Sequence, residues 1–339
     1  MHETTWIRSA YFRSGDLTFL AMVLAVSLCL ARVEAQPTAK VPRIGLLSTF
    51  SQSSIAARAA GFLQGLRELG YVEGKNIALE WRSAEGSNDR ARALAAELVG
   101  LKVDVILSPG PSITRAFKEA TSTIPIVMAQ DTDPVGLGFA ASLARPGGNI
   151  TGLATLAPEM GGKQLDLLKE IVPKLSRVAV IGNSNIPGDA QAIRETVLAA
   201  GAYEIYLRYL DVPDPKDLER TFRVAAKGHA DGLLVLGNPN LNARRKQVVD
   251  LAIKHKLPAT YTRPEYIDAG GLMYYGTNYP DLFRRAAYYV DKILKGSKPA
   301  ELPVEQPTKF ELAINLRTAR QLGLAIPQSV LARADELIQ

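Results

Sequence analysis

Small polar side chains follow directly after apolar runs at several places in the sequence. Ser48, Thr49 and Gln52 come after one such run, and Ser108 and Ser112 come after another. If these runs are parallel strands, the side chains lie at carboxyl ends, where open α/β sheets bind ligands. Hydroxyl, amide and carboxylate groups there could hydrogen-bond a small molecule. The candidate ligand-binding residues are Ser48, Thr49, Gln52, Ser108, Ser112, Gln130, Asp133, Asn183, Asn238, Arg263 and Tyr275.

Each of these residues also has a purely structural explanation. Ser, Asn and Asp behind a strand commonly cap the next helix or turn the chain. Asp131 and Asp133 could be an acid–base pair, but their place just before Pro134 favours capping. Several candidates precede helical patterns, and the backbone N–H groups at a helix N-terminus favour a carboxylate or another anion. Their gathering behind strands in both halves of the chain is what favours a binding site.

The residues that enzymes use most do not form a catalytic pattern. The chain has 3 His, and neither His229 nor His255 follows a predicted strand. Gly-x-Ser-x-Gly, Walker and His-Glu-x-x-His motifs are absent from the sequence. Cys29 is the single cysteine, which excludes a thiol nucleophile or a cysteine metal site in the rest of the chain. We therefore expect a protein that is not an enzyme and that uses no cofactor and no metal.

Five tyrosines crowd into a short stretch late in the chain. Core packing explains each of them singly. Together they could also form an aromatic wall that stacks against a planar ligand. These residues are Tyr261, Tyr266, Tyr274, Tyr275 and Tyr279.

The apolar runs that position these residues occur twice in the same order. Each half has an Arg-led run, a helical pattern, an Asp-led run and a Pro-led run. Arg43 precedes Pro125 by almost the same number of positions as Arg177 precedes Pro258. Two α/β units of matching length predict an α/β protein with two Rossmann-like lobes, each built on a parallel sheet.

Several local patterns make sharper predictions. The spacing of apolar residues predicts a long helix over 279–294 that returns to the first lobe, and a late strand over 309–315. A short helix is predicted over 135–143. Ser112 is predicted to cap the helix that follows the third strand.

The N-terminus has the features of a secretory signal. Arg8 and Arg13 precede an apolar run over 17–31, and Val33-Glu34-Ala35 resembles a cleavage site. We interpret residues 1–35 as a signal peptide. Cys29 suggests a lipid anchor, but Leu28 stands where a small residue is needed, so the soluble exported form is favoured.

The net charge of +6 could suggest nucleic acid as a partner. The basic residues are scattered, and the one dense run, over 244–246, falls on a predicted helix. A solvated helix face explains it, and no nucleic-acid motif accompanies it. We expect no binding to nucleic acid.

The longest motifs resemble the ABC-transporter substrate-binding protein family that includes the tryptophan-binding TrpX-type proteins. The segments 133–136, 143–152, 269–276 and 302–310 carry this resemblance, for example as Leu-Pro-Val-Glu-Gln-Pro-Thr from Leu302. The resemblance implies a type I periplasmic-binding-protein fold, with two lobes, three crossovers and a ligand enclosed by closure. Some members bind aromatic amino acids.

The expected function is that of an exported, periplasmic solute-binding protein. It would act as a monomer, capture a small molecule and deliver it to an ABC permease in the inner membrane. The ligand could be an amino acid or another small planar or anionic solute. We expect one lobe to contain residues 42–150 with 277–300, and the other residues 151–276 with 301–339.

Two other classes of protein remain as alternatives. A LacI-like sensing domain, or a sensory binding protein, shares the expected fold. The LacI-like form needs a DNA-binding helix-turn-helix ahead of Val41, where the apolar run stands instead. A hydrolase or isomerase that uses carboxylates in the cleft would lack an evident base and nucleophile.

Overall fold

The structure, a computed structural model, describes residues 40–49, 55–155, 160–184, 187–237 and 239–339. The apolar run over 17–31 and the candidate residues Gln52 and Asn238 lie outside the described residues. The chain divides into residues 1–41 and a compact unit, Pro42–Gln339, which the following paragraphs concern. Within its described part, no helix has the length and apolar character needed to span a membrane.

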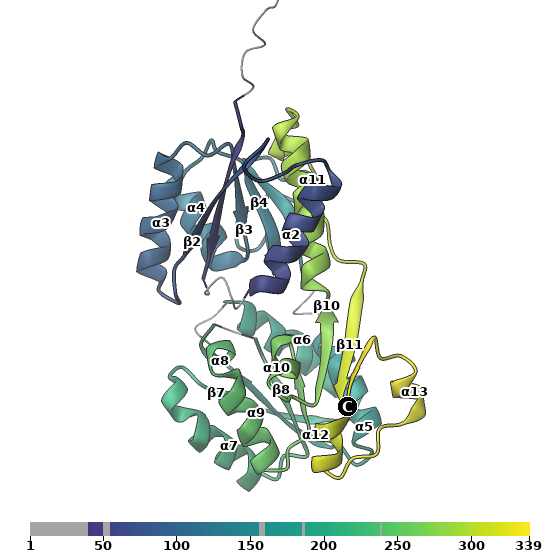
Figure 1. Cartoon of the computed structure of the whole chain (residues 1–339). Helices are drawn as coiled ribbons and strands as arrows, with labels where there is room; N and C mark the ends of the chain where they lie inside the picture. The colour runs from purple at the N-terminus through teal and green to yellow at the C-terminus, as the bar shows by residue number, and fades with distance from the viewer. Residues whose placement is uncertain (1–39, 50–54, 156–159, 185–186, 238) are drawn as a thin grey trace, which may run out of the picture. The chain divides into compact units, whose positions relative to one another are not determined.

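The first sheet has five parallel strands in the order β2-β1-β3-β4-β5 (Figure 1). Apolar runs without alternation form its central strands, as expected for strands buried on both faces. The strands are β1 (Arg43–Ser48), β2 (Ala78–Ser83), β3 (Val105–Ser108), β4 (Ile126–Asp131) and β5 (Ile150–Ala154). The associated helices are α2 (Ala56–Glu68), α3 (Asn88–Gly100), α4 (Pro111–Ala120) and α11 (Tyr279–Leu294).

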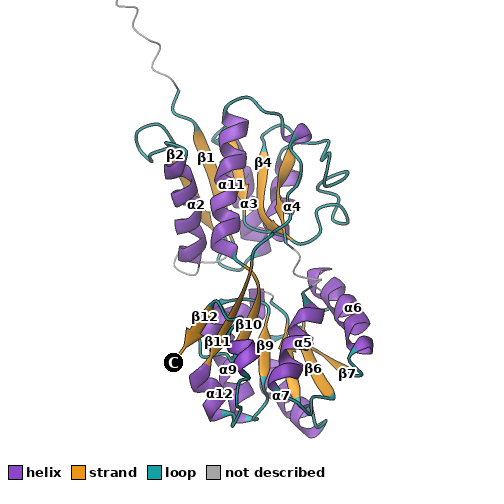
Figure 2. Ribbon diagram, turned by 90° about the vertical axis from the view of Figure 1, so that its right-hand side faces the viewer, coloured by secondary structure: helices purple, strands orange, loops and turns teal. Residues whose placement is uncertain are grey.

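The second sheet has seven strands in the order β12-β11-β10-β9-β8-β6-β7. All its pairs are parallel except β10 with β11, which run antiparallel side by side (Figure 2). Its strands are β6 (Arg177–Gly182), β7 (Tyr206–Asp211), β8 (Gly232–Val235), β9 (Ala259–Tyr261), β10 (Met273–Thr277), β11 (Phe310–Asn315) and β12 (Glu336–Ile338). Its helices are α5 (Gly161–Ile171), α6 (Pro187–Ala202), α7 (Leu218–Lys227), α8 (Pro239–Ala243), α9 (Arg245–Lys254), α10 (Glu265–Asp268), α12 (Leu316–Gln321) and α13 (Gln328–Leu331), with 3₁₀ turns at Pro215–Asp217 and Pro299–Glu301.

The internal repeat is confirmed by the strand order. The first sheet runs β2-β1-β3-β4-β5, and the second contains β7-β6-β8-β9-β10 in the same pattern. The α/β fold with two sheets is therefore as the sequence predicts, except that the second sheet contains the antiparallel pair β10–β11 and is only mostly parallel. The carboxyl ends of the corresponding strands form one edge in each sheet, which is where such folds bind ligands.

Apolar side chains cover both faces of each sheet. In the first sheet, Leu46 packs in one cluster with Phe62 of α2, and Leu47 packs in another with Leu98 of α3 and Phe117 of α4. The second sheet repeats this arrangement with α5 on one face and α7 on the other. Burying a side chain such as Phe117 contributes roughly 1.5–3 kcal/mol to the free energy of unfolding. The sheets are thus rigid supports for the residues at their edges.

Helix α11 packs against α2 on the first sheet, although the two are far apart in sequence (Figure 1). Gly61 and Gly65 of α2 make this close approach possible. A Cβ at Gly61 would lie 2.3 Å from the carbonyl oxygen of Pro280, and one at Gly65 would lie 2.3 Å from that of Arg284. The predicted helix over 279–294, and its return to the first sheet, are confirmed.

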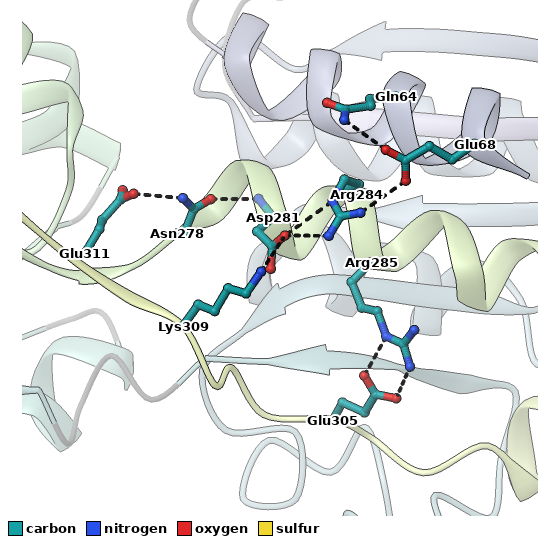
Figure 3. A network of polar contacts seen from close by, with 9 residues as sticks. All are labelled: Gln64, Glu68, Asn278, Asp281, Arg284, Arg285, Glu305, Lys309 and Glu311. Carbon is teal, nitrogen blue, oxygen red and sulfur yellow. Dashed lines mark hydrogen bonds and ion pairs between the residues drawn. The ribbon is translucent and has the colours of Figure 1, made fainter. Parts of the chain in front are cut away.

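A polar network holds the chain where it passes between the elements of the two sheets (Figure 3). Asn278 caps α11, because its Oδ1 accepts from the backbone N of Asp281 at 2.8 Å, while its Nδ2 donates to Glu311 at 2.8 Å. Arg285 forms two hydrogen bonds with Glu305, at 2.9 and 2.8 Å. Burial raises the pKa of Glu311 to about 7, and the hydrogen bond from Asn278 opposes this rise.

Two local predictions are wrong. Residues 135–143 form turns rather than a helix, because Gly138 adopts a left-handed φ of 69° and Phe139 N donates to Pro134 O. Ser112 does not cap α4, because Gly110 is the N-cap and Pro111 occupies the first helical turn. Ser112 instead lies exposed within that turn.

Candidate ligand-binding site

A chain of buried hydrogen bonds at the carboxyl ends of β3 and β4 ends on a carboxylate. The hydroxyl oxygens of Ser108 and Thr114 lie 2.6 Å apart, and Thr114 Oγ1 donates to Asp131 Oδ2 at 2.6 Å. Since a hydroxyl has one proton, Thr114 accepts from Ser108 when it donates to Asp131. All three side chains are fully buried. We call these residues, with Gln130 and Thr155, the Asp131 cluster.

A register irregularity in β4 aims the Asp131 side chain. The pairing of β4 with β5 shifts between Met128 and Asp131. Regular alternation would place Asp131 on the face of Val127 and Ala129, which pack with α2 and α11. Asp131 instead contacts Thr114 of α4, and α4 packs on the opposite face with Met128. β-bulges re-aim side chains in this way at sheet edges.

Three atoms of the Asp131 cluster are buried and have no hydrogen-bond partner among the described residues. They are Gln130 Oε1, Asp131 Oδ1 and Thr155 Oγ1. The surrounding groups are bonded: Gln130 Nε2 donates to Pro109 O, and Thr155 N donates to Asp131 O at 2.6 Å. An amide oxygen and a carboxylate oxygen only accept, so two of the three atoms require a donor.

Asp131 has no cationic partner in the part of the chain that the structure describes. The internal segments outside that part, 50–54, 156–159, 185–186 and 238, contain no Lys, Arg or His. Burial raises the pKa of Asp131 to about 7, and only the hydrogen bond from Thr114 opposes this rise. The cluster therefore holds a buried carboxyl that pairs with no cation among the described residues.

A second buried cluster joins α2, α10 and the start of α11. Arg58 of α2 is 5% exposed and forms an ion pair with Glu265 of α10. The guanidinium carbons of Arg58 and Arg263 lie 5.0 and 4.8 Å from the centroid of the same Tyr279 ring. Burial lowers the pKa of Arg58, the Glu265 carboxylate opposes this, and Arg263 adds to it. We call Arg58, Arg263, Glu265 and Tyr279 the guanidinium cluster.

The ends of β8 and β9 position Arg263. A Cβ at Gly237, which follows β8, would lie 2.5 Å from Cγ of Arg263, so only glycine leaves room for this side chain. Tyr261 of β9 stacks on Tyr266 of α10, with ring centroids 4.6 Å apart and planes at 12°. This stacking fixes the turn that carries Arg263 and Glu265.

The guanidinium cluster has an excess of positive charge. Two guanidinium groups, of Arg58 and Arg263, face one carboxylate, of Glu265. Arg263 NH1, Glu265 Oε2 and the Tyr266 hydroxyl are buried without a hydrogen-bond partner among the described residues. A buried guanidinium with an unpaired N–H group binds a carboxylate well, because the two groups match in charge and geometry.

The hydroxyl–carboxyl pair of Thr114 and Asp131 is fully buried, and neither cluster contains a His or a Cys. Among the described residues, no three His, Cys, Asp or Glu side chains are placed to hold a metal ion. A pocket of about 590 Å³ opens elsewhere, between α9, α10 and α12, and none of the candidate residues lines it.

Comparison with known families identifies the chain. The family described as ABC transporter substrate binding protein matches residues 43–338. The chain belongs to this family. Its relatives are substrate-binding proteins rather than enzymes, among them a tyrosine-binding protein of Clostridioides difficile. That protein is 25% identical over 288 residues, which cover 84% of this chain and 82% of the relative.

Two solved structures share the fold of this substrate-binding protein. A conserved domain protein of Vibrio cholerae has a TM-score of 0.82 and 29% identity, covering 88% of this chain and 100% of the other. The domain of Streptococcus pneumoniae in complex with L-Trp also has a TM-score of 0.82, with 25% identity, covering 88% of this chain and 99% of the other. The fold is the two-lobe α/β fold of the type I periplasmic binding proteins.

Only some of the predicted site residues of this substrate-binding protein lie in the two clusters. Ser108 and Gln130 lie in the Asp131 cluster, and Arg263 lies in the guanidinium cluster. Ser48 is the last residue of β1 and is buried. Thr49 follows it, and its backbone carbonyl oxygen accepts from Gly86 N at 2.7 Å.

The remaining predicted residues lie outside these clusters. Asn183 follows β6, is buried, and its backbone N donates to Asp189 at 2.7 Å. Asp133 caps a turn, because its Oδ1 accepts from Gly136 N at 2.8 Å. Tyr275 stacks on Phe310 with ring centroids 6.2 Å apart, and Ser112 is exposed.

Sequence reasoning missed five residues of the two clusters, which are Asp131, Thr114, Thr155, Arg58 and Glu265. Capping is the wrong interpretation for Asp131. Its side chain is buried at the end of β4, where the bulge turns it toward α4. Thr114, Arg58 and Glu265 lie on helices without any motif, and no sequence signal distinguishes them from surface residues. Tyr279 was recognised only as one member of a row of tyrosines.

Proposed function

We propose that this chain is an exported substrate-binding protein of an ABC importer and that its ligand is an amino acid. The observation that carries the ligand class is Arg263, whose NH1 atom is buried and has no hydrogen-bond partner among the described residues. It belongs to a cluster with one guanidinium more than carboxylates. An α-carboxylate would supply the missing acceptors and the missing negative charge.

The relatives support this ligand class. One relative is a tyrosine-binding protein, and one solved structure holds L-Trp. The tyrosines around Arg263 would suit an aromatic side chain, since Tyr266 and Tyr279 are both held close to the guanidinium groups. Stacking on such rings contributes about 0.5–1.5 kcal/mol beyond the burial of area.

Capture would proceed by closure of two lobes. We assign residues 42–150 with 277–300 to one lobe, and residues 151–276 with 301–339 to the other. A ligand that contacts both lobes binds the closed state more tightly and shifts the population toward it. The ion pair of Arg58 in α2 with Glu265 in α10 would then form one contact between the lobes.

Membership of the family supports a cellular role in import. Residues 1–35 would be a signal peptide that directs the protein to the periplasm, where it would act as a soluble monomer. It would carry no cofactor, catalyse no reaction, and pass its ligand to a permease in the inner membrane. The apolar run before Ala35 supports this assignment.

Calorimetric titration with L-tyrosine and L-tryptophan tests the proposal. The wild-type protein should bind one or both, and Arg263→Gln should weaken binding at least tenfold, since a hydrogen bond to a charged group contributes about 1.5–3 kcal/mol. Arg333→Gln, which removes an exposed pair with Glu170, is the matched control and should leave affinity unchanged. Equal affinities of wild type and Arg263→Gln would refute the assignment of Arg263.

A further inference from the structure

We propose that Asp131 recognises a protonated amine of the captured solute, with Gln130 and Thr155 completing the amine site. This inference rests on the proposed function, because it assigns the second charged group of the ligand. Asp131 lies at the carboxyl end of the first sheet and is fully buried. Gln130 is 8% exposed and Thr155 is 2% exposed, so all three side chains are removed from water.

The hydrogen-bonding capacity of the cluster matches an ammonium group. An ammonium donates three hydrogen bonds and accepts none. The atoms without a partner among the described residues are Asp131 Oδ1, Gln130 Oε1 and Thr155 Oγ1, and each can accept one. The groups beside them are already bonded, since Thr114 donates to Asp131 Oδ2 and Gln130 Nε2 donates to Pro109 O. Among the described residues these three acceptors are thus open to donors of a bound molecule.

The charge of Asp131 points to the same ligand. A buried carboxylate is unfavourable unless a cation or several hydrogen bonds compensate it. Within the described residues Asp131 accepts from Thr114 and pairs with no cation. The β4 irregularity that turns Asp131 toward α4 keeps this carboxylate in place. A structural role would be filled as well by Asn, whereas an ammonium site requires the negative charge.

No other charged group in the described elements packed on β4 faces Asp131. Strands β3 and β5 contain no ionisable residue. On α4, Arg115 and Lys118 lie over the Phe139 ring, and Glu119 is exposed. The ionisable groups of α11 have other contacts. They are Asp281 and Arg284 with each other, Arg285 with Glu305, Tyr289 with Pro303, Asp291 with Tyr71 and Lys295, and Lys292 over Tyr288.

Three related probes separate the two charged groups of the ligand. L-Tyrosine carries an ammonium and a carboxylate, tyramine only the ammonium, and 3-(4-hydroxyphenyl)propionate only the carboxylate. The protein variants are wild type, Asp131→Asn and the control Asp104→Asn. Asp104 lies at the opposite end of the same sheet and accepts from Arg43 N at 2.8 Å, a bond that Asn can keep.

Calorimetric titration at pH 8 should show the loss of amine recognition. Asp131→Asn should weaken binding of L-tyrosine and tyramine at least tenfold and should not weaken binding of the propionate. Asp104→Asn should bind like wild type. If Asp131→Asn weakens all three probes equally, or none of them, Asp131 has only a packing role and the inference is overturned.

The pH profile gives a second readout that a packing role would not produce. Binding to the carboxylate form should make wild-type affinity for L-tyrosine rise about tenfold per pH unit below about pH 7 and level off above it. Asp131→Asn should show no such rise. A wild-type affinity that is constant from pH 5 to pH 8 would contradict the inference.

The outcome remains decisive if wild type binds none of the probes. The amino-acid ligand of the proposed function then fails, and mass spectrometry of small molecules released from purified wild type and Asp131→Asn decides the role of Asp131. A released compound with a basic nitrogen that is absent from the variant supports the amine site. A compound without such a nitrogen, or no compound at all, overturns it.

Discussion

The Asp131 cluster and the guanidinium cluster are opposite in charge and similar in construction. Asp131 is a buried carboxyl held by the neutral hydroxyl of Thr114, so the first cluster lacks positive charge. Arg58 forms an ion pair with Glu265, while Arg263 lies over the Tyr279 ring and has no ion pair among the described residues, so the second cluster lacks negative charge. The Asp131 cluster lies at strand ends of the first sheet, whereas the guanidinium cluster joins α2 and α11 with α10. Each contains buried polar atoms without a partner among the described residues.

The difference shows how a binding protein can hold uncompensated charge. Polar groups that fold into a stable core are usually hydrogen-bonded, because each unpaired one costs about 1–3 kcal/mol. Here the excess charges are fixed by groups that position them without neutralising them, such as Thr114 and Tyr279. Among the described residues, the Asp131 cluster lacks a cation, and the guanidinium cluster has one anion for two cations.

Breaking the guanidinium cluster should have the largest effect on stability. Arg58→Met removes the partner of Glu265 and leaves a mostly buried carboxylate. Loss of one member of a buried ion pair typically costs 3–5 kcal/mol, so we expect the free energy of unfolding to fall by about 3 kcal/mol. Urea denaturation at pH 7 measures this change. The double variant Arg58→Met/Glu265→Gln should recover at least half of the loss, and no recovery would show that the charge of Glu265 is unimportant.

Neutralising Asp131 should raise the free energy of unfolding, whereas breaking the guanidinium cluster should lower it. The pKa of Asp131 is about 7 in the folded protein and near 3.8 in the unfolded chain, so the folded state holds an extra proton between these values. Wild-type stability should therefore fall as pH rises from about 4 to about 7 and then stay level. Asp131→Asn should not show this fall. Its free energy of unfolding should therefore rise by about 2 kcal/mol relative to that of wild type as the pH increases from 5 to 8. Thermal unfolding across this range measures the gain, and a difference that does not change with pH would rule out the buried charge.

Moving Arg263 without removing it should have a smaller effect. Gly237→Ala places a Cβ 2.5 Å from Cγ of Arg263, and overpacking of this kind costs about 1–2 kcal/mol. The displaced guanidinium should also bind L-tyrosine more weakly. Gly100→Ala is the control, because a Cβ there meets nothing within 4 Å and should leave both quantities nearly unchanged. Titration and urea denaturation of both variants would show whether the position of Arg263 matters.

The smallest effect should come from Asp133, which stands two positions after Asp131. Its Oδ1 accepts from Gly136 N at 2.8 Å, and an Asn side chain can make the same bond. Asp133→Asn should change the free energy of unfolding by less than about 0.5 kcal/mol, as is usual for substitutions away from the core. A tenfold loss of affinity in this variant would add Asp133 to the ligand site and would blur the contrast with Asp131.

Much of the fold could be predicted because its signals are local or repeated. The long helix Tyr279–Leu294 and the late strand Phe310–Asn315 appear as expected from residue type and spacing. The doubled order of strands follows from the doubled order of apolar runs. The short edge strand Glu336–Ile338 was not predicted, because three partly exposed residues carry no periodic pattern.

The candidate site was predicted only in part, because its members meet through the tertiary structure. Strand ends can be read from the sequence, so Ser108, Gln130 and Arg263 were found. Arg58 and Glu265 are 207 positions apart, and only the packing of α2 near α10 brings their charges together. The direction of Asp131 depends on one register shift against β5, which inverts the alternation that a strand pattern predicts. Residue types and spacing thus determined the two lobes and the edges of their sheets. The pairing of Arg58 with Glu265 and the direction of the Asp131 side chain were decided by packing, because both depend on contacts between residues distant in sequence.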